Sequence, residues 1–192
     1  MSKDIKLVCG LFGLENFFPD EGIRSYINIA KEAEALGFDA VSVTDHVVMG
    51  KNLHKYPFGK FPLPSEAPWY EPLSVLNMIG SHTTSIKLAT AILITPLRNP
   101  ALLAKTAATI DVISNGRLEL GVGLGWQKEE FEAAGVDFEN REEIFWETLA
   151  ILKKFWSDSP QAIKVNIFNL MIFGAIPNPF KELTYPYCLA LK

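Results

Sequence analysis

The chain has 192 residues, of which 48% are hydrophobic and 21% charged, a composition typical of a globular domain. Its formal net charge of −4, with scattered basic residues, gives no general attraction to nucleic acid or to an anionic membrane. No apolar run approaches the ~20 residues of a membrane span, and Cys9 and Cys188 form neither a disulfide framework nor a zinc knuckle. We therefore expect a cytoplasmic domain without a metal site.

Strands and helices are predicted to alternate along the chain. Short apolar runs predict buried strands at 5–12, 40–44, 87–94 and 117–123, and helical spacing or capping signals predict helices at 22–36, 71–83, 99–113 and 141–156. This alternation indicates an α/β fold with a parallel sheet. Two architectures fit, an open doubly wound sheet and a (β/α)₈ barrel, which needs about 250 residues. The pattern supplies about four units and becomes irregular after residue 158.

Thr44, Asp45 and His46 follow the second predicted strand. Ligand sites of parallel α/β folds lie at the carboxyl ends of the strands. A histidine there could protonate, stack on or hydrogen-bond a ring, and the neighbouring aspartate could fix its tautomer. The alternative is structural, with Asp45 capping a turn and His46 filling a loop.

The ends of the third and fourth strands are also candidate ligand contacts. Small residues at the strand end 89–92 would let a flat ligand lie against the strand, although on pattern alone ordinary packing explains them better. Gly121, Gly123 and Gly125 would allow close approach to the backbone, which predicts a phosphate or ring site. Their G-x-G-x-G spacing does not fit the G-x-G-x-x-G of dinucleotide folds. A tight turn without a ligand is the alternative.

Five segments in a fixed order carry a resemblance to a known family. They are A-x-x-L-G-F-D-A-V-x-V-T-D-H at 33–46, Y-E-P-L at 70–73, the stretch 86–105, S-N-G-R-L-E-L-G-V-G-L-G-W within 109–126, and the helix with Arg141 and Glu147. Together they resemble the bacterial luciferase-like superfamily of flavin and deazaflavin oxidoreductases, most closely its coenzyme F-420 branch. This resemblance implies a (β/α)₈ barrel, here truncated to about its first four βα units at 1–158.

The resemblance also implies a cofactor and the residues around it. The cofactor would be coenzyme F-420 or FMN, and the reaction hydride transfer or monooxygenation of a small organic substrate. His46, supported by Asp45, would be catalytic beside the ring. The implied cofactor contacts are Thr90, Ala91, Ile92, Gly123, Gly125 and Trp126, with a cis peptide between Ala91 and Ile92. Trp126 stands where some deazaflavin-dependent sugar-phosphate dehydrogenases carry an acid, which argues against that activity.

Residues 159–192 are expected to form a divergent or irregular tail. A half barrel would leave apolar strand edges and helix faces open, which predicts a homo-oligomer or pairing with another chain. This expectation supports a second functional hypothesis, a non-catalytic truncated barrel that acts as an interaction module.

Overall fold

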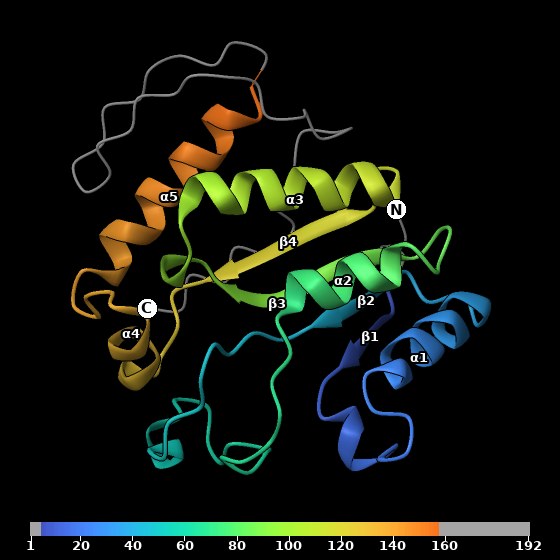
Figure 1. Cartoon of the computed structure of the whole chain (residues 1–192), viewed down its shortest axis with the longest axis horizontal. Coiled ribbons are helices and arrows are strands. Elements are labelled where there is room, and N and C mark those ends of the chain that lie inside the picture. Colours follow the sequence, from blue (N-terminus) through green and yellow to red (C-terminus); the bar gives the residue numbers. More distant parts are fainter. Residues whose placement is uncertain (1–4, 158–192) are drawn as a thin grey trace.

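A computed structural model of the protein describes residues 5–157 (Figure 1). Four parallel strands form one sheet in the order β1-β2-β3-β4: β1 (Val8–Leu11), β2 (Ala40–Val43), β3 (Lys87–Ile94) and β4 (Leu118–Gly123). The helices are α1 (Arg24–Ala35), α2 (Pro72–Gly80), α3 (Pro100–Ser114), α4 (Lys128–Ala134) and α5 (Arg141–Phe155). Three short 3₁₀ helices lie at η1 (Leu14–Asn16), η2 (Leu53–Lys55) and η3 (Thr95–Leu97). The predicted tail lies outside the described residues.

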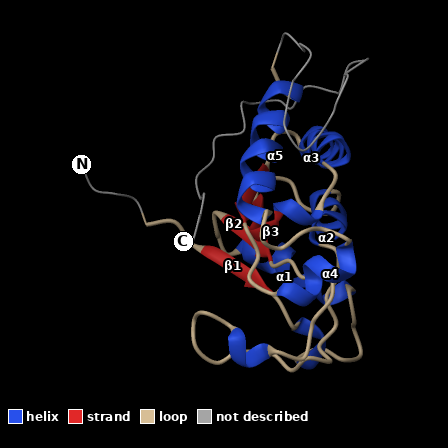
Figure 2. Ribbon diagram, turned by 90° about the vertical axis from the view of Figure 1, so that its left-hand side faces the viewer, coloured by secondary structure: helices blue, strands red, loops and turns tan. Residues whose placement is uncertain are grey.

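The strand order decides between the two architectures. Each strand pairs with the one before it in the sequence, in parallel register from Val8↔Ala40 onward. Helices α1, α2 and α3 lie on the same face of the sheet (Figures 1 and 2). A doubly wound sheet reverses its strand order at a switch point, whereas a barrel winds in one direction. The described residues therefore form the first half of a (β/α)₈ barrel, as predicted.

The core lies between the sheet and its helices. Val41 and Leu88 from the strands pack with Leu76, Ile79 and Ala104 from α2 and α3, and all five are fully buried. β1 departs from the prediction of a buried strand, since Val8 is 48% exposed. The reason is its place at the edge of the sheet, where β2 is its only partner among the described strands. No helix in the described part of the chain is long and apolar enough to cross a membrane.

Capping residues set the ends of the helices. Glu71 accepts a hydrogen bond from the Ser74 N–H (2.7 Å) at the start of α2, and Asn99 accepts from two N–H groups at the start of α3. Gly37 follows the last turn of α1 and has a φ of 80°, a left-handed conformation that stops the helix. Asn99 and Gly37 are residue types that commonly mark helix ends. Helix α4 was not predicted, because its seven residues form less than two turns.

Two polar anchors, the buried Arg117 and the partly exposed Glu34, fix the amino ends of the strands. The Arg117 guanidinium donates to the carbonyls of Gly80, Thr83 and Ile86 at distances of 2.7 to 3.0 Å. The Glu34 carboxylate accepts backbone N–H bonds from residues 84–86. Both anchors lie opposite the carboxyl ends of the strands, which are left free for a site.

Candidate functional site

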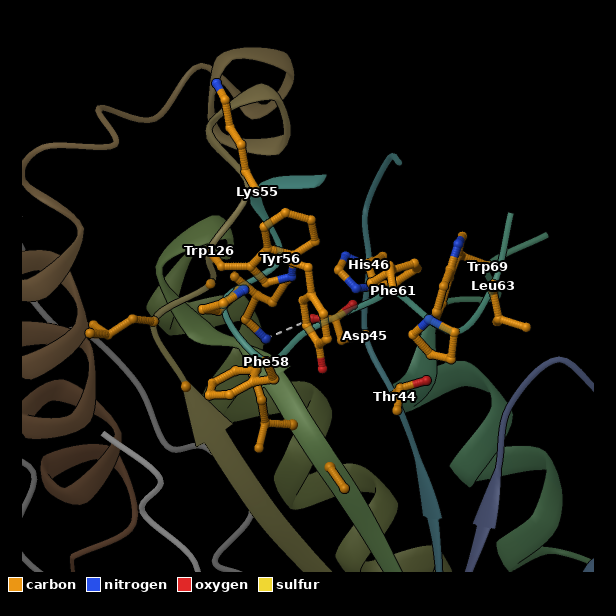
Figure 3. Close-up of a pocket in the computed structure, with 18 of the residues that line it drawn as sticks. Thr44, Asp45, His46, Lys55, Tyr56, Phe58, Phe61, Leu63, Trp69 and Trp126 are labelled. Carbon is orange, nitrogen blue, oxygen red and sulfur yellow. Dashed lines mark hydrogen bonds between the residues drawn. The ribbon is translucent and has the colours of Figure 1, made fainter. Parts of the chain in front are cut away.

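A cavity of about 650 Å³ lies at the carboxyl ends of the strands (Figure 3). Its wall is built from strand ends and from the long loop between β2 and α2, with a few residues from the segments flanking α4. Most of the lining side chains are apolar or aromatic, with only a few polar groups. The lining residues are Phe12, Thr44, Asp45, His46, Lys55, Tyr56, Pro57, Phe58, Phe61, Pro62, Leu63, Trp69, Ala91, Ile92, Ile94, Gly123, Leu124, Gly125, Trp126, Phe138 and Arg141.

Aromatic rings surround His46 on the cavity wall. The ring centroid of His46 lies 4.6 Å from Trp69, 5.7 Å from Phe61 and 6.2 Å from Trp126, all in edge-to-face geometry. Figure 3 shows these rings grouped around His46, with Tyr56 beside Trp126. This arrangement keeps the His46 side chain 90% buried, with 10% of its surface exposed.

Glu130 on α4 is the carboxylate that contacts His46. Its Oε2 lies 3.0 Å from His46 Nδ1, and its Oε1 accepts a 2.8 Å hydrogen bond from the Val47 N–H. Glu130 itself is completely buried. Sequence reasoning missed this residue, because α4 was not predicted and 84 positions separate the two partners. The acidic pair Glu129-Glu130, followed by Gly135, was the available signal for a short helix.

Residues at the start of α4 also form hydrogen bonds with Gly50 and Asn52 in the loop after β2. Gln127 Oε1 accepts a 2.9 Å bond from the Gly50 N–H, and its Nε2 donates to the Gly50 carbonyl. Asn52 donates to Glu129. A Cβ on Gly50 would lie 2.9 Å from Glu129 Cβ, so the close approach of loop and helix requires glycine at this position.

Asp45 does not support His46, contrary to the sequence-based prediction. Its two oxygens accept hydrogen bonds from Arg98 at 2.5 and 2.9 Å, and one of them accepts a 2.8 Å bond from the Ile94 N–H. Arg98 also contacts Glu71 at 3.2 Å. Burial acts to lower the pKa of Arg98, but these carboxylates outweigh it and the pKa is raised. Asp45 lines the cavity while it joins the ends of β2 and β3.

The strand-end residues divide into two groups. Ala91, Ile92, Gly123, Gly125 and Trp126 line the cavity, and the Ala91–Ile92 peptide is cis as the resemblance implied. Thr90 does not line the cavity. It is buried in the sheet, where its hydroxyl donates a 2.7 Å bond to the Gly121 carbonyl.

The glycines of β4 are explained by the neighbouring strand. A Cβ on Gly121 would lie 2.2 Å from the Thr90 carbonyl oxygen, and one on Gly123 would lie 2.7 Å from Ile92 Cδ1. The β3–β4 register shifts between Thr90 and Leu93, which brings β3 against these glycines. Close packing of the two strands therefore accounts for them without a ligand. Their contact with a cofactor stays a prediction.

Comparison with known proteins gives several relatives. The sequence profile of the luciferase-like monooxygenase family matches residues 13–183. An uncharacterised protein of Sinorhizobium fredii is 35% identical over 132 residues, which cover 69% of this chain and 33% of that protein. An uncharacterised protein of Mycobacterium tuberculosis is 32% identical over 154 residues, covering 76% of this chain and 53% of that protein. F-420-dependent glucose-6-phosphate dehydrogenase of Amycolatopsis mediterranei is 27% identical, with coverages of 78% and 43%.

Solved structures share the fold. Monooxygenase RslO1 from Streptomyces bottropensis superposes with a TM-score of 0.72 at 20% identity, covering 96% of this chain and 52% of that chain. An F-420-dependent secondary alcohol dehydrogenase in complex with an F-420–acetone adduct superposes with a TM-score of 0.70 at 24% identity. The match covers 94% of this chain and 52% of that chain. The chain thus spans about half the length of these proteins. Because the family profile matches most of the sequence and the half-barrel fold agrees with it, this chain belongs to the luciferase-like monooxygenase family.

Proposed function

We propose that this chain provides the ring-binding wall for coenzyme F-420 or FMN in an oxidoreductase that acts on a small organic substrate. The reaction would be hydride transfer or monooxygenation. The observation that carries the proposal is the cavity at the carboxyl ends of the strands. Its wall combines His46, the cis Ala91–Ile92 peptide and the glycine-rich end of β4.

The chemistry of the cavity fits a flat heteroaromatic ring with polar edges. Its wall is largely apolar and aromatic, as small-molecule sites usually are. Two buried nitrogens on lining residues, Trp69 Nε1 and Arg141 Nε, have no hydrogen-bond partner among the described residues. A buried donor without a partner is costly, and both nitrogens belong to side chains of the cavity wall. Lys55 adds a second positive charge to the lining.

The residues of this chain would bind and orient, and exclude water. A bound flavin or deazaflavin supplies the hydride or oxygen chemistry. His46 offers a ring nitrogen to the ligand, and the Asp45–Arg98 pair holds the ends of β2 and β3 that present Thr44 and Ile94. The aromatic side chains of the loop after β2 form much of the apolar wall.

Two observations bear on the cofactor and the substrate. F-420 is named for a curated relative and for a solved structure, while FMN is named for other solved structures of the same fold. F-420 is therefore the first cofactor to test. Trp126 lines the cavity and contacts Tyr56 and Phe61, with ring centroids 5.3 and 5.9 Å away. A bulky indole at this position favours an uncharged organic substrate over a sugar phosphate.

The test is a binding titration of the full chain with F-420 and with FMN, each in oxidised and reduced form. His46→Ala is expected to weaken binding about tenfold, the effect of one lost hydrogen bond of ~1–1.5 kcal/mol. His82→Ala is the matched control, because His82 bonds the Met78 carbonyl at the end of α2, outside the cavity lining. Wild-type protein that binds neither cofactor would refute the proposal.

A second function is favoured by the exposed edge of the sheet. Within residues 5–157, β1 pairs only with β2, and Leu7, Val8 and Phe12 are 53%, 48% and 44% exposed. A non-catalytic half barrel could bind a second copy or another chain there. A protein of this kind would be colourless after purification and would form assemblies without cofactor.

A further inference from the structure

Glu130 stands out among the described buried groups because each of its oxygens lies within hydrogen-bond distance of a nitrogen. Oε1 accepts from the Val47 N–H at 2.8 Å, and Oε2 lies 3.0 Å from His46 Nδ1. The side chain is completely buried, so water does not compete for these oxygens. In its ionised form Glu130 acts only as an acceptor.

This contact determines which nitrogen of His46 carries the proton. A neutral imidazole has one donor nitrogen and one acceptor nitrogen, and the nitrogen that faces a carboxylate is the donor. Nδ1 therefore holds the hydrogen, and Nε2 keeps its lone pair. Nε2 makes no hydrogen bond with any described residue, although His46 lines the cavity. The free acceptor of the ring is thus available to a ligand.

We propose that Glu130 is a positioning residue that holds His46 in its Nδ1–H tautomer and keeps an unprotonated Nε2 for the cavity. The ligand atom opposite Nε2 is then a hydrogen donor, such as a hydroxyl group or a ring N–H. The nature of that ligand rests on the proposed function. The tautomer itself does not, since it follows from contacts within the chain.

Glutamine at position 130 would reverse the arrangement. Its amide has one acceptor and one donor end, whereas the glutamate site presents two acceptors. The Val47 N–H is a backbone group and cannot change, so the amide oxygen would face Val47. The amide NH₂ would then donate to His46 Nδ1, which must become the acceptor. Glu130→Gln is nearly isosteric, yet it is expected to move the proton to Nε2.

A purely structural role for Glu130 predicts a different outcome. In that case it would only fasten the loop after β2 to α4, as Gln127 does through Gly50. Glu129 is the matched control, because it lies on the same turn of α4 and bonds Asn52 rather than His46. Glu129→Gln removes the same charge from the same helix and should leave the tautomer unchanged.

The experiment is ¹⁵N NMR of the histidine ring nitrogens in the full chain at pH 8, without cofactor. The chain has three histidines, so spectra of His54→Gln and His82→Gln assign the signals of His46. We expect Nδ1–H in the wild type and in Glu129→Gln, and Nε2–H in Glu130→Gln. A wild-type ring with Nε2–H, or with both nitrogens protonated, would overturn the proposal even if the Glu130 variant failed to fold.

A second measurement links the tautomer to the cavity. Glu130→Gln should weaken binding of reduced F-420 or FMN about as much as His46→Ala does, and should have no further effect in the His46→Ala background. Additive losses would show that Glu130 acts on the fold rather than through His46. If the wild type binds neither cofactor, the proposed function fails, while the NMR result still decides the role of Glu130.

Discussion

At the scale of single residues, the two carboxylates near His46 have different partners. Asp45 is adjacent to His46 in the sequence but bonds Arg98 and the Ile94 N–H, whereas Glu130 is distant and contacts the ring. The reason is geometric, because successive residues of an extended chain point to opposite sides. Asp45 therefore faces β3 and His46 faces α4. Sequence adjacency suggested Asp45 as the partner of His46, whereas the structure gives that contact to Glu130.

The Asp45–Arg98 pair makes a testable contribution to stability. Asp45 and Arg98 are 1% and 15% exposed at their side chains, so removing one partner leaves a poorly hydrated charge. Asp45→Asn is expected to lower the free energy of unfolding by ~3–5 kcal/mol. In a double-mutant cycle with Arg98→Gln, urea unfolding should give a coupling energy of roughly 1–3 kcal/mol. A coupling near zero would mean that Asp45 does not hold Arg98.

At the scale of elements, the strands and long helices were predictable and the short ones were not. β3 matches its predicted range of 87–94, and α3 and α5 match theirs within one or two residues, since apolar runs and caps mark them. α4 was missed, although it places Gln127, Glu129 and Glu130 against the loop after β2. Its contacts join segments about 80 positions apart, and no local pattern encodes such a distance.

The glycines of β4 can be tested by their different surroundings. Gly121→Ala is expected to destabilise the fold by more than ~3 kcal/mol, because its Cβ would lie 2.2 Å from a backbone oxygen of β3 that cannot move aside. Gly123→Ala should destabilise the fold less than Gly121→Ala does, because the Ile92 side chain that the new Cβ would contact can adjust. Gly10→Ala is the control, as its nearest contact would be an ordinary 3.6 Å. Thermal or urea unfolding should rank the variants in this order, and equal costs would contradict the account.

Glu34 connects α1 to the turn before β3 and gives a prediction on pH. It accepts backbone N–H bonds from Thr84, Ser85 and Ile86 at 2.9, 2.6 and 2.9 Å. Burial acts to raise the pKa of Glu34, but these bonds outweigh it and lower the pKa from 4.5 to about 2. Since the folded value lies below the unfolded one, the stabilisation is full above pH 4.5 and is lost as the pH falls toward about 2.

Glu34→Gln is therefore expected to lower the free energy of unfolding by ~1–3 kcal/mol at pH 7, the range for hydrogen bonds to a charged group. The difference from wild type should shrink as the pH falls below about 4.5. Urea unfolding between pH 3 and pH 7 measures it. Glu32→Gln, on the exposed side of the same helix, should show no such trend. A difference that stays constant across this range would refute the role of Glu34.

At the scale of the whole molecule, spacing alone left the architecture open and the resemblance pointed to a barrel. The uninterrupted order β1-β2-β3-β4 agrees with that resemblance. This winding brings the ends of all four strands to one side, where the cavity forms. It also leaves β1 with a free edge in the described part of the chain. The same topology therefore accounts for both the candidate site and an exposed apolar surface.

The edge of β1 predicts concentration-dependent self-association of the full chain. An unpaired strand edge carries free N–H and C=O groups, and Val8 adds apolar surface to it, being 48% exposed. Val8→Lys places a charge at this edge and should shift the sedimentation profile toward lower mass. Leu102→Lys is the matched control, because Leu102 is 67% exposed on α3, away from β1. If both variants reduce the mass equally, association depends on general surface hydrophobicity. If neither does, the β1 edge is not the contact surface.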